Sequence, residues 1–346
     1  MAVLTDRIAK DSTVGVIVNP WAGKDIRRLH AAVGHTPDTV KAGIVRRVVI
    51  AAAECGVSRI VLGNDASGLA ARAVEGLELG IPVDFLDEEP TGSRLDTVRA
   101  CARMWKEQCG AVVVLGGDGT CRDAAIGWPD VPLVAISTGT NNVFPSSLDG
   151  SSAGAAAAFV ASGVVSIVEV AQRAKRIFVH IEDPAAGHSD DMALVEVALI
   201  DAAFSGARAV VDASAIRHVV AATATPASTG LSSVAGRLLP VDRSQPGGVY
   251  VRFGPGGRRV RMPLMPGSFA TVDVAEVRAL AAGESVVLSG PGMLAFDGER
   301  DRRVGPHAII TMTVDNSGPL VIDVEQTLIR AAHDRRFDVP EDSHGS

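Results

Sequence analysis

The chain has 346 residues, which at about 150 residues per domain suggests two domains. Hydrophobic residues make up 47% and charged residues 21% of the sequence, a composition that excludes a disordered chain, a fibrous protein and a coiled coil. The net charge of −7 and the single Tyr argue against a nucleic-acid partner, which calls for a basic surface and, for single strands, stacking aromatic side chains.

The first part of the sequence alternates short apolar runs with helical patterns. The predicted strands are residues 14–18, 59–62, 82–86, 111–115 and 132–136. The predicted helices are residues 38–54, 67–77, 94–109 and 120–127. Because strands buried on both faces of a parallel sheet are continuously apolar, this alternation predicts an α/β fold. We expect a doubly wound parallel sheet that forms a nucleotide-binding domain over residues 1–150.

After about residue 162 the sequence becomes rich in strand-like runs separated by Pro-Gly turn signals. The predicted strands are residues 167–170, 177–181, 194–200, 248–253, 268–274, 285–288 and 307–314. They predict a β-rich, antiparallel domain that spans residues 151–325. Residues 324–335 show a helical pattern, and we expect the segment 326–346 to return to the N-terminal domain.

The sequence favours a cytoplasmic protein. None of the four cysteines stands in a C-x-x-C pair, so free thiols in a reducing compartment are the simplest interpretation. The first 13 residues carry four charges and no apolar core, which is unlike a signal peptide. Two uncharged stretches, 131–148 and 150–168, are interrupted by Pro, Asn, Gly or Ser, so we expect no membrane association.

Five loops carry residue types that bind phosphates or metals. They are residues 19–24 (NPWAGK), 116–120 (GGDGT), 137–142 (STGTNN), 225–233 (TPASTGLSS) and 297–299 (DGE). The first three directly follow the first, fourth and fifth predicted strands. Ligands of doubly wound sheets bind beyond the carboxyl ends of the strands, which makes these loops the leading candidates for a binding site.

The loop of residues 116–120 is the most informative. Glycines let backbone N–H groups approach a phosphate, and the helix that follows favours an anion at its N-terminus. The carboxylate of Asp118 can act there as a general base or hold Mg²⁺. The alternative is a plain strand-to-helix turn with Asp118 as the N-cap residue. The chain contains neither a P-loop motif nor a G-x-G-x-x-G motif after its first strand.

Several segments together carry a family resemblance. The GGDGT loop resembles the signature shared by NAD kinases, diacylglycerol and sphingosine kinases and phosphofructokinases. Further segments of this superfamily are similar to four other stretches of the chain, namely residues 19–23, 193–197 (ALVEV), 225–229 and 296–299. The sequence of residues 137–145 is most similar to that of ATP-NAD kinase-like proteins of the acetoin catabolism protein X (AcoX) type. The resemblance spans roughly residues 14–328.

The resemblance implies an ATP-dependent kinase with Asp118 as the catalytic carboxylate, Mg²⁺ as cofactor and NAD, at its 2′-hydroxyl, as the leading acceptor. It also implies a homo-oligomer, a dimer or larger. The residues implied in nucleotide binding are Asn19, Gly23, Lys24, Gly116, Gly117, Gly119, Thr120, Thr138, Gly139, Thr140, Asn141 and Asn142. The resemblance implies that the β-rich domain of residues 151–325 binds the acceptor, through Glu196, Thr225, Ser228 and Thr229. Asp297 and Glu299 are the candidate metal ligands, and Lys24 and Arg122 are candidates for neutralising phosphate charge.

Two departures from the NAD kinase pattern leave the acceptor open. Val195 stands where NAD kinases carry an Asn, and the loop that begins at Thr225 lacks their Tyr. A carboxamide and an aromatic ring that could contact NAD are therefore missing. Another metabolite, a lipid, or a non-catalytic nucleotide-binding regulator linked to acetoin catabolism are the alternatives.

Some of these residues also have purely structural interpretations. Asp297-Gly298 is a strong hairpin signal, and Glu196 could face solvent on an alternating strand. Asp96 could face the nucleotide, but capping a helix is its simpler interpretation. His180 and His188, together with Asp183, Asp190 and Asp191, suggest a metal site, but a solvated loop over residues 182–191 is the simpler interpretation.

Overall fold

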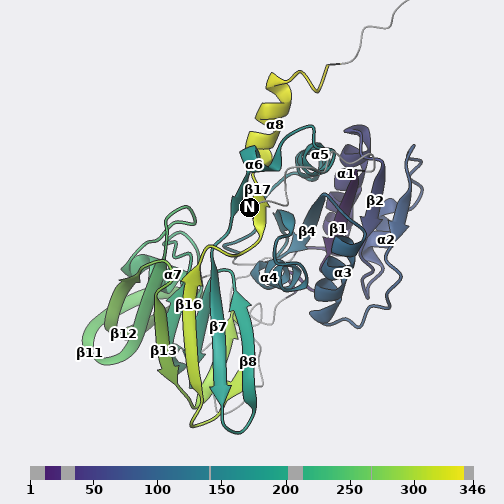
Figure 1. Cartoon of the computed structure of the whole chain (residues 1–346). Helices are drawn as coiled ribbons and strands as arrows, with labels where there is room; N and C mark the ends of the chain where they lie inside the picture. Colours follow the sequence, from purple (N-terminus) through teal and green to yellow (C-terminus); the bar gives the residue numbers. More distant parts are fainter. Residues whose placement is uncertain (1–11, 25–35, 140–141, 202–212, 266, 339–346) are drawn as a thin grey trace, which may run out of the picture.

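The computed structural model describes residues 12–24, 36–139, 142–201, 213–265 and 267–338, which form an α/β half and a β-rich half (Figure 1). The elements of the α/β half, in chain order, are β1 (Thr13–Val18), α1 (Asp38–Glu54), β2 (Arg59–Leu62), α2 (Leu69–Val74), β3 (Val83–Phe85), α3 (Leu95–Lys106), β4 (Ala111–Gly116), α4 (Asp118–Gly127), β5 (Pro132–Ser137), α5 (Gly150–Ala161), α6 (Ile167–Val170) and β6 (Ala171–Arg173). Two elements from the end of the chain, β17 (Leu320–Ile322) and α8 (Val324–His333), join them.

A seven-stranded sheet forms the centre of the α/β half, in the order β3-β2-β1-β4-β5-β17-β6. All of its pairings are parallel except that of β17 with β6. The continuous burial of β1 and β4 matches their unbroken apolar sequences, because helices cover both faces. The predicted doubly wound parallel sheet is therefore confirmed.

The helices divide between the two faces of this sheet. On one face, α1, α2, α5 and α8 enclose a core that includes Val48, Leu69, Ala156 and Ala331. On the other face, α3 and α4 pack Met104 and Cys121 against the sheet. This second core continues into the β-rich half through Leu194 and Val195.

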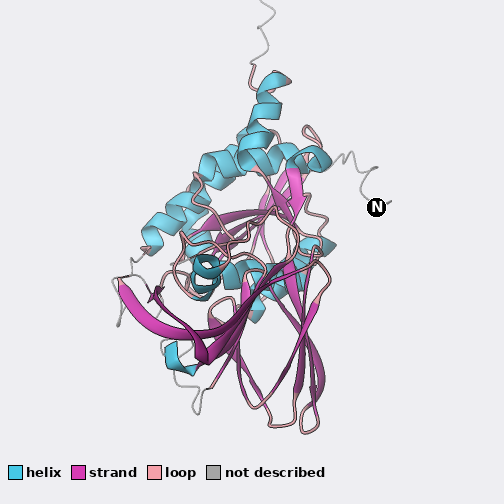
Figure 2. Cartoon of the chain, turned by 90° about the vertical axis from the view of Figure 1, so that its left-hand side faces the viewer, coloured by secondary structure: helices cyan, strands magenta, loops and turns pink. Residues whose placement is uncertain are grey.

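The β-rich half contains β7 (Arg176–Asp183), β8 (Gly187–Ala193), β9 (Glu196–Ile200), a 3-10 turn (Ala213–Ala215), β10 (Ile216–Ala221), α7 (Leu231–Leu238), β11 (Gly248–Met265), β12 (Ser268–Leu280), β13 (Ser285–Ser289), β14 (Gly292–Phe296), β15 (Glu299–Val304) and β16 (Ile309–Asp315). They form a six-stranded sheet, β12-β11-β10-β9-β14-β15, and a four-stranded sheet, β13-β16-β7-β8. The strand pairings within both sheets are antiparallel, as expected. Figure 2 shows most helices in the upper part of the molecule and the long strands below them.

The two antiparallel sheets share a core that includes Ile177, Val179, Leu199 and Phe296. Strands with one face in this core alternate buried and exposed side chains, as β7 does from Arg176 to Glu182. Helix α7 covers the other face of the six-stranded sheet. This alternation points every second side chain of β7 outward.

Two predictions in this region were wrong. Residues 167–170 form α6 and not a strand, with the extended backbone beginning only at Ala171. Most of the predicted solvated loop at residues 182–191 belongs to the β7–β8 hairpin. The polar sequence of β8 hid its strand character because one of its faces is open to solvent. Within the described ranges, no helix has the length and apolar character needed to cross a bilayer.

Candidate functional site

Three of the five candidate loops follow neighbouring strands of the parallel sheet. Strand β4 lies between β1 and β5, with Val18 opposite Leu115 and Gly116 opposite Ser137. The loops after these strands therefore emerge together at the carboxyl edge of the sheet, where the strand order reverses between β1 and β4. Open α/β sheets bind ligands at such a switch point.

Asn19 ties the first of these loops to the start of α4. Its side-chain amide donates a hydrogen bond of 2.9 Å to the Thr120 hydroxyl, and its Oδ1 accepts the Trp21 N–H at 2.8 Å. The Thr120 Oγ1 also accepts the Gly117 N–H at 3.4 Å. Asn19 and Thr120, which the resemblance assigned to nucleotide binding, thus fix the shape of the glycine loop (residues 116–120, GGDGT).

Asp118 reaches across the site to the loop after β5. Its Oδ1 accepts hydrogen bonds from the backbone N–H groups of Val143 at 3.0 Å and Phe144 at 2.8 Å. The side chain is only 8% exposed. Gly117 occupies the N-cap of α4, and Asp118 is the first helical residue. The alternative interpretation of Asp118 as an N-cap residue is therefore wrong.

The glycines of the site let the loops pack closely on one another. A Cβ atom at Gly116 would collide with the Thr120 side chain. Gly23 has a φ of +74°, and a Cβ there would lie 2.7 Å from the Thr138 carbonyl oxygen. At Gly117 and Gly139 a Cβ would lie 2.9 Å and 3.0 Å from the Asn142 side chain. Their approach to a phosphate remains a prediction.

The loop after β5 contributes two further polar groups. Asn142 donates from Nδ2 to the Ser137 hydroxyl at 2.8 Å. Thr138 is 2% exposed, and its hydroxyl has no hydrogen-bond partner among the described residues. A buried polar group without a partner is unfavourable by about 1–3 kcal/mol, so this hydroxyl is a candidate to contact a ligand. Thr140 and Asn141 lie outside the described residues.

The lysines near the first loop already have partners. The Lys24 ammonium forms an ion pair of 2.8 Å with Asp38, and this interaction lowers the pKa of the Asp38 carboxyl. Lys41 on α1 is fully buried and donates to the Pro20 carbonyl at 2.8 Å. Burial lowers the pKa of Lys41 to about 8. The sequence pattern did not single out Lys41, since a lysine on a helix normally faces solvent.

Arg122 joins the two halves of the molecule. Its Nε donates to the Met192 carbonyl at 2.6 Å, and its Nη2 pairs with Asp191 at 2.8 Å. The guanidinium also lies 4.6 Å from the centre of the Phe296 ring. These contacts, all with the β-rich half, give Arg122 a structural role and argue against the predicted neutralisation of phosphate.

Asp297 holds the ALVEV segment of residues 193–197 in place. It is 7% exposed and accepts the backbone N–H groups of Leu194, Val195 and Glu196 at 3.1, 2.8 and 3.2 Å. Its φ of 49° and the positive φ of Gly298 form the turn between β14 and β15, so the hairpin interpretation is confirmed. The side chain of Glu299 lies outside the described residues.

Val195 and Glu196, in the ALVEV segment, are both buried. Glu196 is 6% exposed, so its interpretation as a solvent-facing residue is wrong. Val195 is fully buried in the core that contains Cys121 and Ala124 of α4. The position at which NAD kinases carry an Asn therefore belongs to the apolar contact between the two halves.

The loop after β10 contains the predicted acceptor residues. The Ser228 hydroxyl donates to the Thr225 carbonyl at 3.0 Å, and Thr225, Ser228 and Thr229 are all partly exposed. Ala224, at the start of this loop, pairs with Val241.

Arg243 is a residue that the sequence analysis missed. Two positions after Val241, its Nη2 donates to the Val143 carbonyl at 2.8 Å. The loop of residues 225–233 is thereby connected to Asp118, because Val241 pairs with Ala224 and Val143 contacts both Arg243 and Asp118. No pattern in residues 240–247 (PVDRSQPG) distinguishes this arginine from the many others in the chain.

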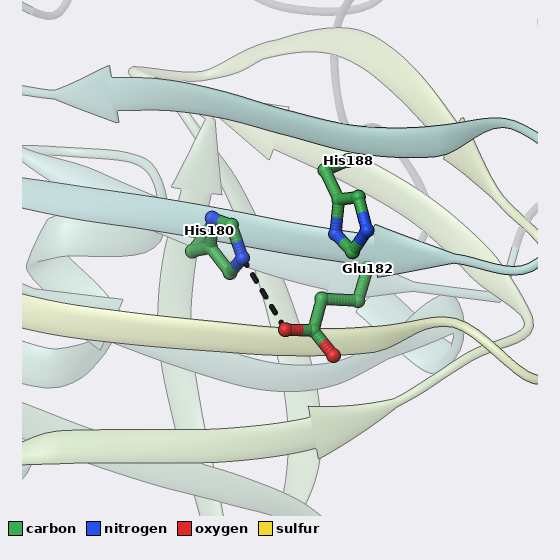
Figure 3. Close-up of side chains that lie close together, drawn as sticks. All are labelled: His180, Glu182 and His188. Carbon is green, nitrogen blue, oxygen red and sulfur yellow. Dashed lines mark ion pairs between the residues drawn. The ribbon is translucent and has the colours of Figure 1, made fainter.

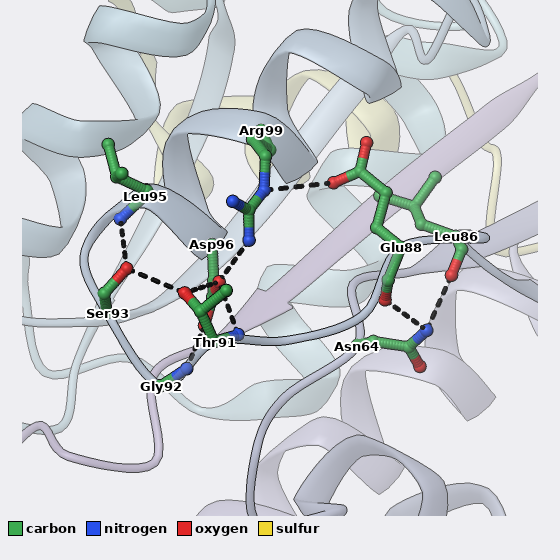
Figure 4. Close-up of polar contacts among 9 residues, drawn as sticks. All are labelled: Asn64, Leu86, Glu88, Thr91, Gly92, Ser93, Leu95, Asp96 and Arg99. Atoms are coloured by element: carbon green, nitrogen blue, oxygen red, sulfur yellow. Dashed lines mark hydrogen bonds and ion pairs between the residues drawn. The ribbon is translucent and has the colours of Figure 1, made fainter.

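Asp96 is the second residue of α3 and does not cap the helix, whose N-cap is Arg94, so the capping interpretation is wrong. It accepts the Thr91 and Gly92 N–H groups at 2.9 and 2.7 Å and pairs with Arg99 at 2.6 Å (Figure 4). These contacts hold the turn that precedes α3. They leave the nucleotide interpretation of Asp96 without support.

Comparisons with known proteins agree with this architecture. A family model of the ATP-NAD kinase N-terminal domain matches residues 14–164, and one of the acetoin catabolism protein X C-terminal domain matches residues 175–317. A structural match to the crystal structure of yeast NADH kinase complexed with NADH covers 97% of this chain and 90% of the yeast chain. Its TM-score is 0.53, and the two sequences are 12% identical. At that identity the similarity shows a shared fold.

Two relatives are similar in sequence. An uncharacterized protein of Archaeoglobus fulgidus is 33% identical over 132 residues, which cover 38% of this chain and 36% of that protein. Acetoin catabolism protein X of Cupriavidus necator is 34% identical over 322 residues, which cover 90% of both chains. The chain therefore belongs to the acetoin catabolism protein X family, whose N-terminal half is related to the ATP-NAD kinases.

Proposed function

We propose that this protein is an ATP-dependent kinase that transfers a phosphoryl group to a hydroxyl of a small molecule. The observation that carries the proposal is the position of Asp118, a carboxylate in the glycine loop at the switch point of the sheet. The match of residues 14–164 to the ATP-NAD kinase N-terminal domain supports it.

In this proposal the phosphates of ATP lie against the loops after β1, β4 and β5. The N-terminus of α4 favours their negative charge, and the buried Thr138 hydroxyl gains a hydrogen-bond partner. Mg²⁺ in kinases is usually held by phosphate oxygens and one or two carboxylates. Asp118, in the glycine loop beside the proposed phosphate position, is the proposed carboxylate ligand. Asp297 is assigned no such role, because its carboxylate holds the backbone N–H groups of residues 194–196 in the β-rich half.

Asp118 is also the proposed general base. The acceptor hydroxyl gives its proton to the Asp118 carboxylate, its oxygen attacks the terminal phosphorus, and ADP leaves. Such catalysis depends chiefly on positioning and on stabilising the charge of the transferring group. Because Asp118 holds Val143 and Phe144, substrate binding would have to loosen this loop before the carboxylate can take the proton.

NAD is the leading acceptor, since a relative in fold is an NADH kinase. Glu196, Thr225, Ser228 and Thr229 would line its site. The burial of Val195 favours a second candidate, because no carboxamide is present there to contact NAD. That candidate is a kinase of another hydroxylated metabolite, or a nucleotide-binding regulator without turnover.

The test is to incubate the full chain with ATP, MgCl₂ and a metabolite panel that includes NAD and NADH, and to read phosphate gain by mass spectrometry. A kinase will add one phosphate mass to an acceptor, and Asp118→Asn will reduce that rate by orders of magnitude while ATP still binds. Asp130→Asn, at an exposed position, is the matched control.

Each result separates the candidates. Phosphorylation of NAD supports the leading acceptor, and phosphorylation of another metabolite supports the second candidate. If ATP binds in calorimetry but no compound gains a phosphate, the kinase proposal fails and the regulator remains.

A further inference from the structure

The β7–β8 hairpin gathers four polar side chains on its outer face. His180 pairs across the strands with Asp190, and Glu182 pairs with His188. Ile177, Val179 and Ile181 occupy the alternate, buried positions of β7, so His180 and Glu182 face outward. Figure 3 shows that the rings of His180 and His188 and the carboxylate of Glu182 converge on one another. The proposed kinase reaction uses none of these residues.

The spacing of these groups suits a metal ion. One potential ligand atom from each of His180, Glu182 and His188 lies within 4.8 Å of the others. Zinc-ligand bonds of about 2.0–2.2 Å in tetrahedral geometry place ligand atoms about 3.4 Å apart. The side chains of His180 and Glu182 are 37% and 51% exposed, so small rotations can close the remaining distance.

Asp190 sets the orientation of the His180 ring. Its Oδ1 lies 2.6 Å from His180 Nδ1, and because a carboxylate only accepts hydrogen bonds, Nδ1 carries the proton. In the neutral ring, Nε2 then presents a lone pair at 3.4 Å from Glu182 Oε1. A carboxylate behind a histidine is also the usual arrangement around protein-bound zinc.

We propose that His180 Nε2, the Glu182 carboxylate and a ring nitrogen of His188 bind a divalent transition-metal ion, with Zn²⁺ as the best match. Asp190 acts as the positioning residue behind His180, and water completes the coordination. Imidazole ligands favour zinc, copper or nickel, whereas Mg²⁺ prefers oxygen ligands. This site is therefore distinct in chemistry and in place from the proposed ATP site.

The test is calorimetric titration of ZnCl₂ into the full chain, freed of metal with EDTA and carrying no histidine tag. We expect one zinc ion per chain and an increase in Tm at excess zinc, because a ligand that binds the folded state stabilises it. Excess MgCl₂ should not displace the zinc. His180→Ala and His188→Ala should each weaken binding at least tenfold, and Asp190→Asn by about 10–100-fold.

His333→Ala, at an exposed histidine of α8, is the matched control and should bind zinc as the parent does. Glu182→Gln removes a ligand with little change in shape, so it tests the site if a histidine variant fails to fold. Absence of stoichiometric zinc binding would overturn the proposal. Unchanged affinity in the His180→Ala/His188→Ala double variant would also overturn it, since the metal would then be held elsewhere, for example by thiols.

Discussion

Arg243 Nη2 donates a hydrogen bond of 2.8 Å to the carbonyl oxygen of Val143. The backbone N–H group of Val143 donates a second hydrogen bond, to the Asp118 carboxylate. The loop after β5 is therefore held by a carboxylate of the α/β half and by a guanidinium of the β-rich half. This relationship couples the proposed ATP site to the loop that carries the predicted acceptor residues.

We expect Arg243→Ala to weaken ATP binding, because the loop that begins at Ser137 loses the hydrogen bond between Arg243 and the Val143 carbonyl. A hydrogen bond to a charged donor contributes about 1.5–3 kcal/mol, so the loss in affinity should be about tenfold or more. Calorimetry with ATP measures it. Arg103→Ala, remote from the site on α3, serves as the control, and equal affinities of the two variants would contradict the coupling.

Gly116→Ala should destabilise the protein by about 1–3 kcal/mol, since the added methyl group collides with the Thr120 side chain. Gly80→Ala provides the comparison, because a Cβ there meets no atom within 4 Å. Its effect on the free energy of unfolding should stay within about 0.5 kcal/mol. Chemical denaturation measures both variants. Equal stabilities would show that the glycine loop relaxes at no energetic cost.

Removing Arg122 should loosen the contact between the two halves. Arg122→Ala leaves Asp191 and the Met192 carbonyl without their buried partner, for an expected loss of about 3–5 kcal/mol. Arg103→Ala removes an exposed pair with Glu107 and should change the free energy of unfolding by less than about 1 kcal/mol. Thermal denaturation that fails to separate these variants would refute the structural role of Arg122.

His218 should make the protein less stable in mild acid. Burial, together with Arg217 and Arg252, lowers the pKa of His218 to about 4, whereas an unfolded histidine has a pKa of about 6.5. Between these values the unfolded state binds more protons, so the free energy of unfolding falls as pH drops from 6.5 to 4. The contribution should be about 1–2 kcal/mol after allowance for its partial exposure.

His218→Gln removes this titration and retains a polar partner for the Tyr250 hydroxyl, which lies 2.9 Å from His218 Nδ1. The difference in unfolding free energy between parent and variant should therefore change between pH 7 and pH 4.5. Parallel curves for the parent and His218→Gln would disprove the assignment.

Local patterns determined the α/β half in some detail. The predicted helix 38–54 coincides with α1, and the predicted strand 59–62 coincides with β2. Such segments are predictable because burial on both sheet faces demands unbroken apolar runs, and a helix buries one face at a regular spacing. The GGDGT loop was identifiable for a similar reason, since its residues are contiguous in the chain.

Contacts between distant segments were not predictable in this way. Asp118 and Val143 are separated by 25 positions, Arg122 and Asp191 by 69, and Arg243 and Val143 by 100. The polar sequence of β8 likewise became a strand only by pairing with β7. The sequence by itself therefore determined the elements, the order of the loops and the family resemblance. Tertiary structure decided which side chains meet, because hydrogen bonds and ion pairs depend on spatial distance and burial, which the neighbours in sequence do not specify.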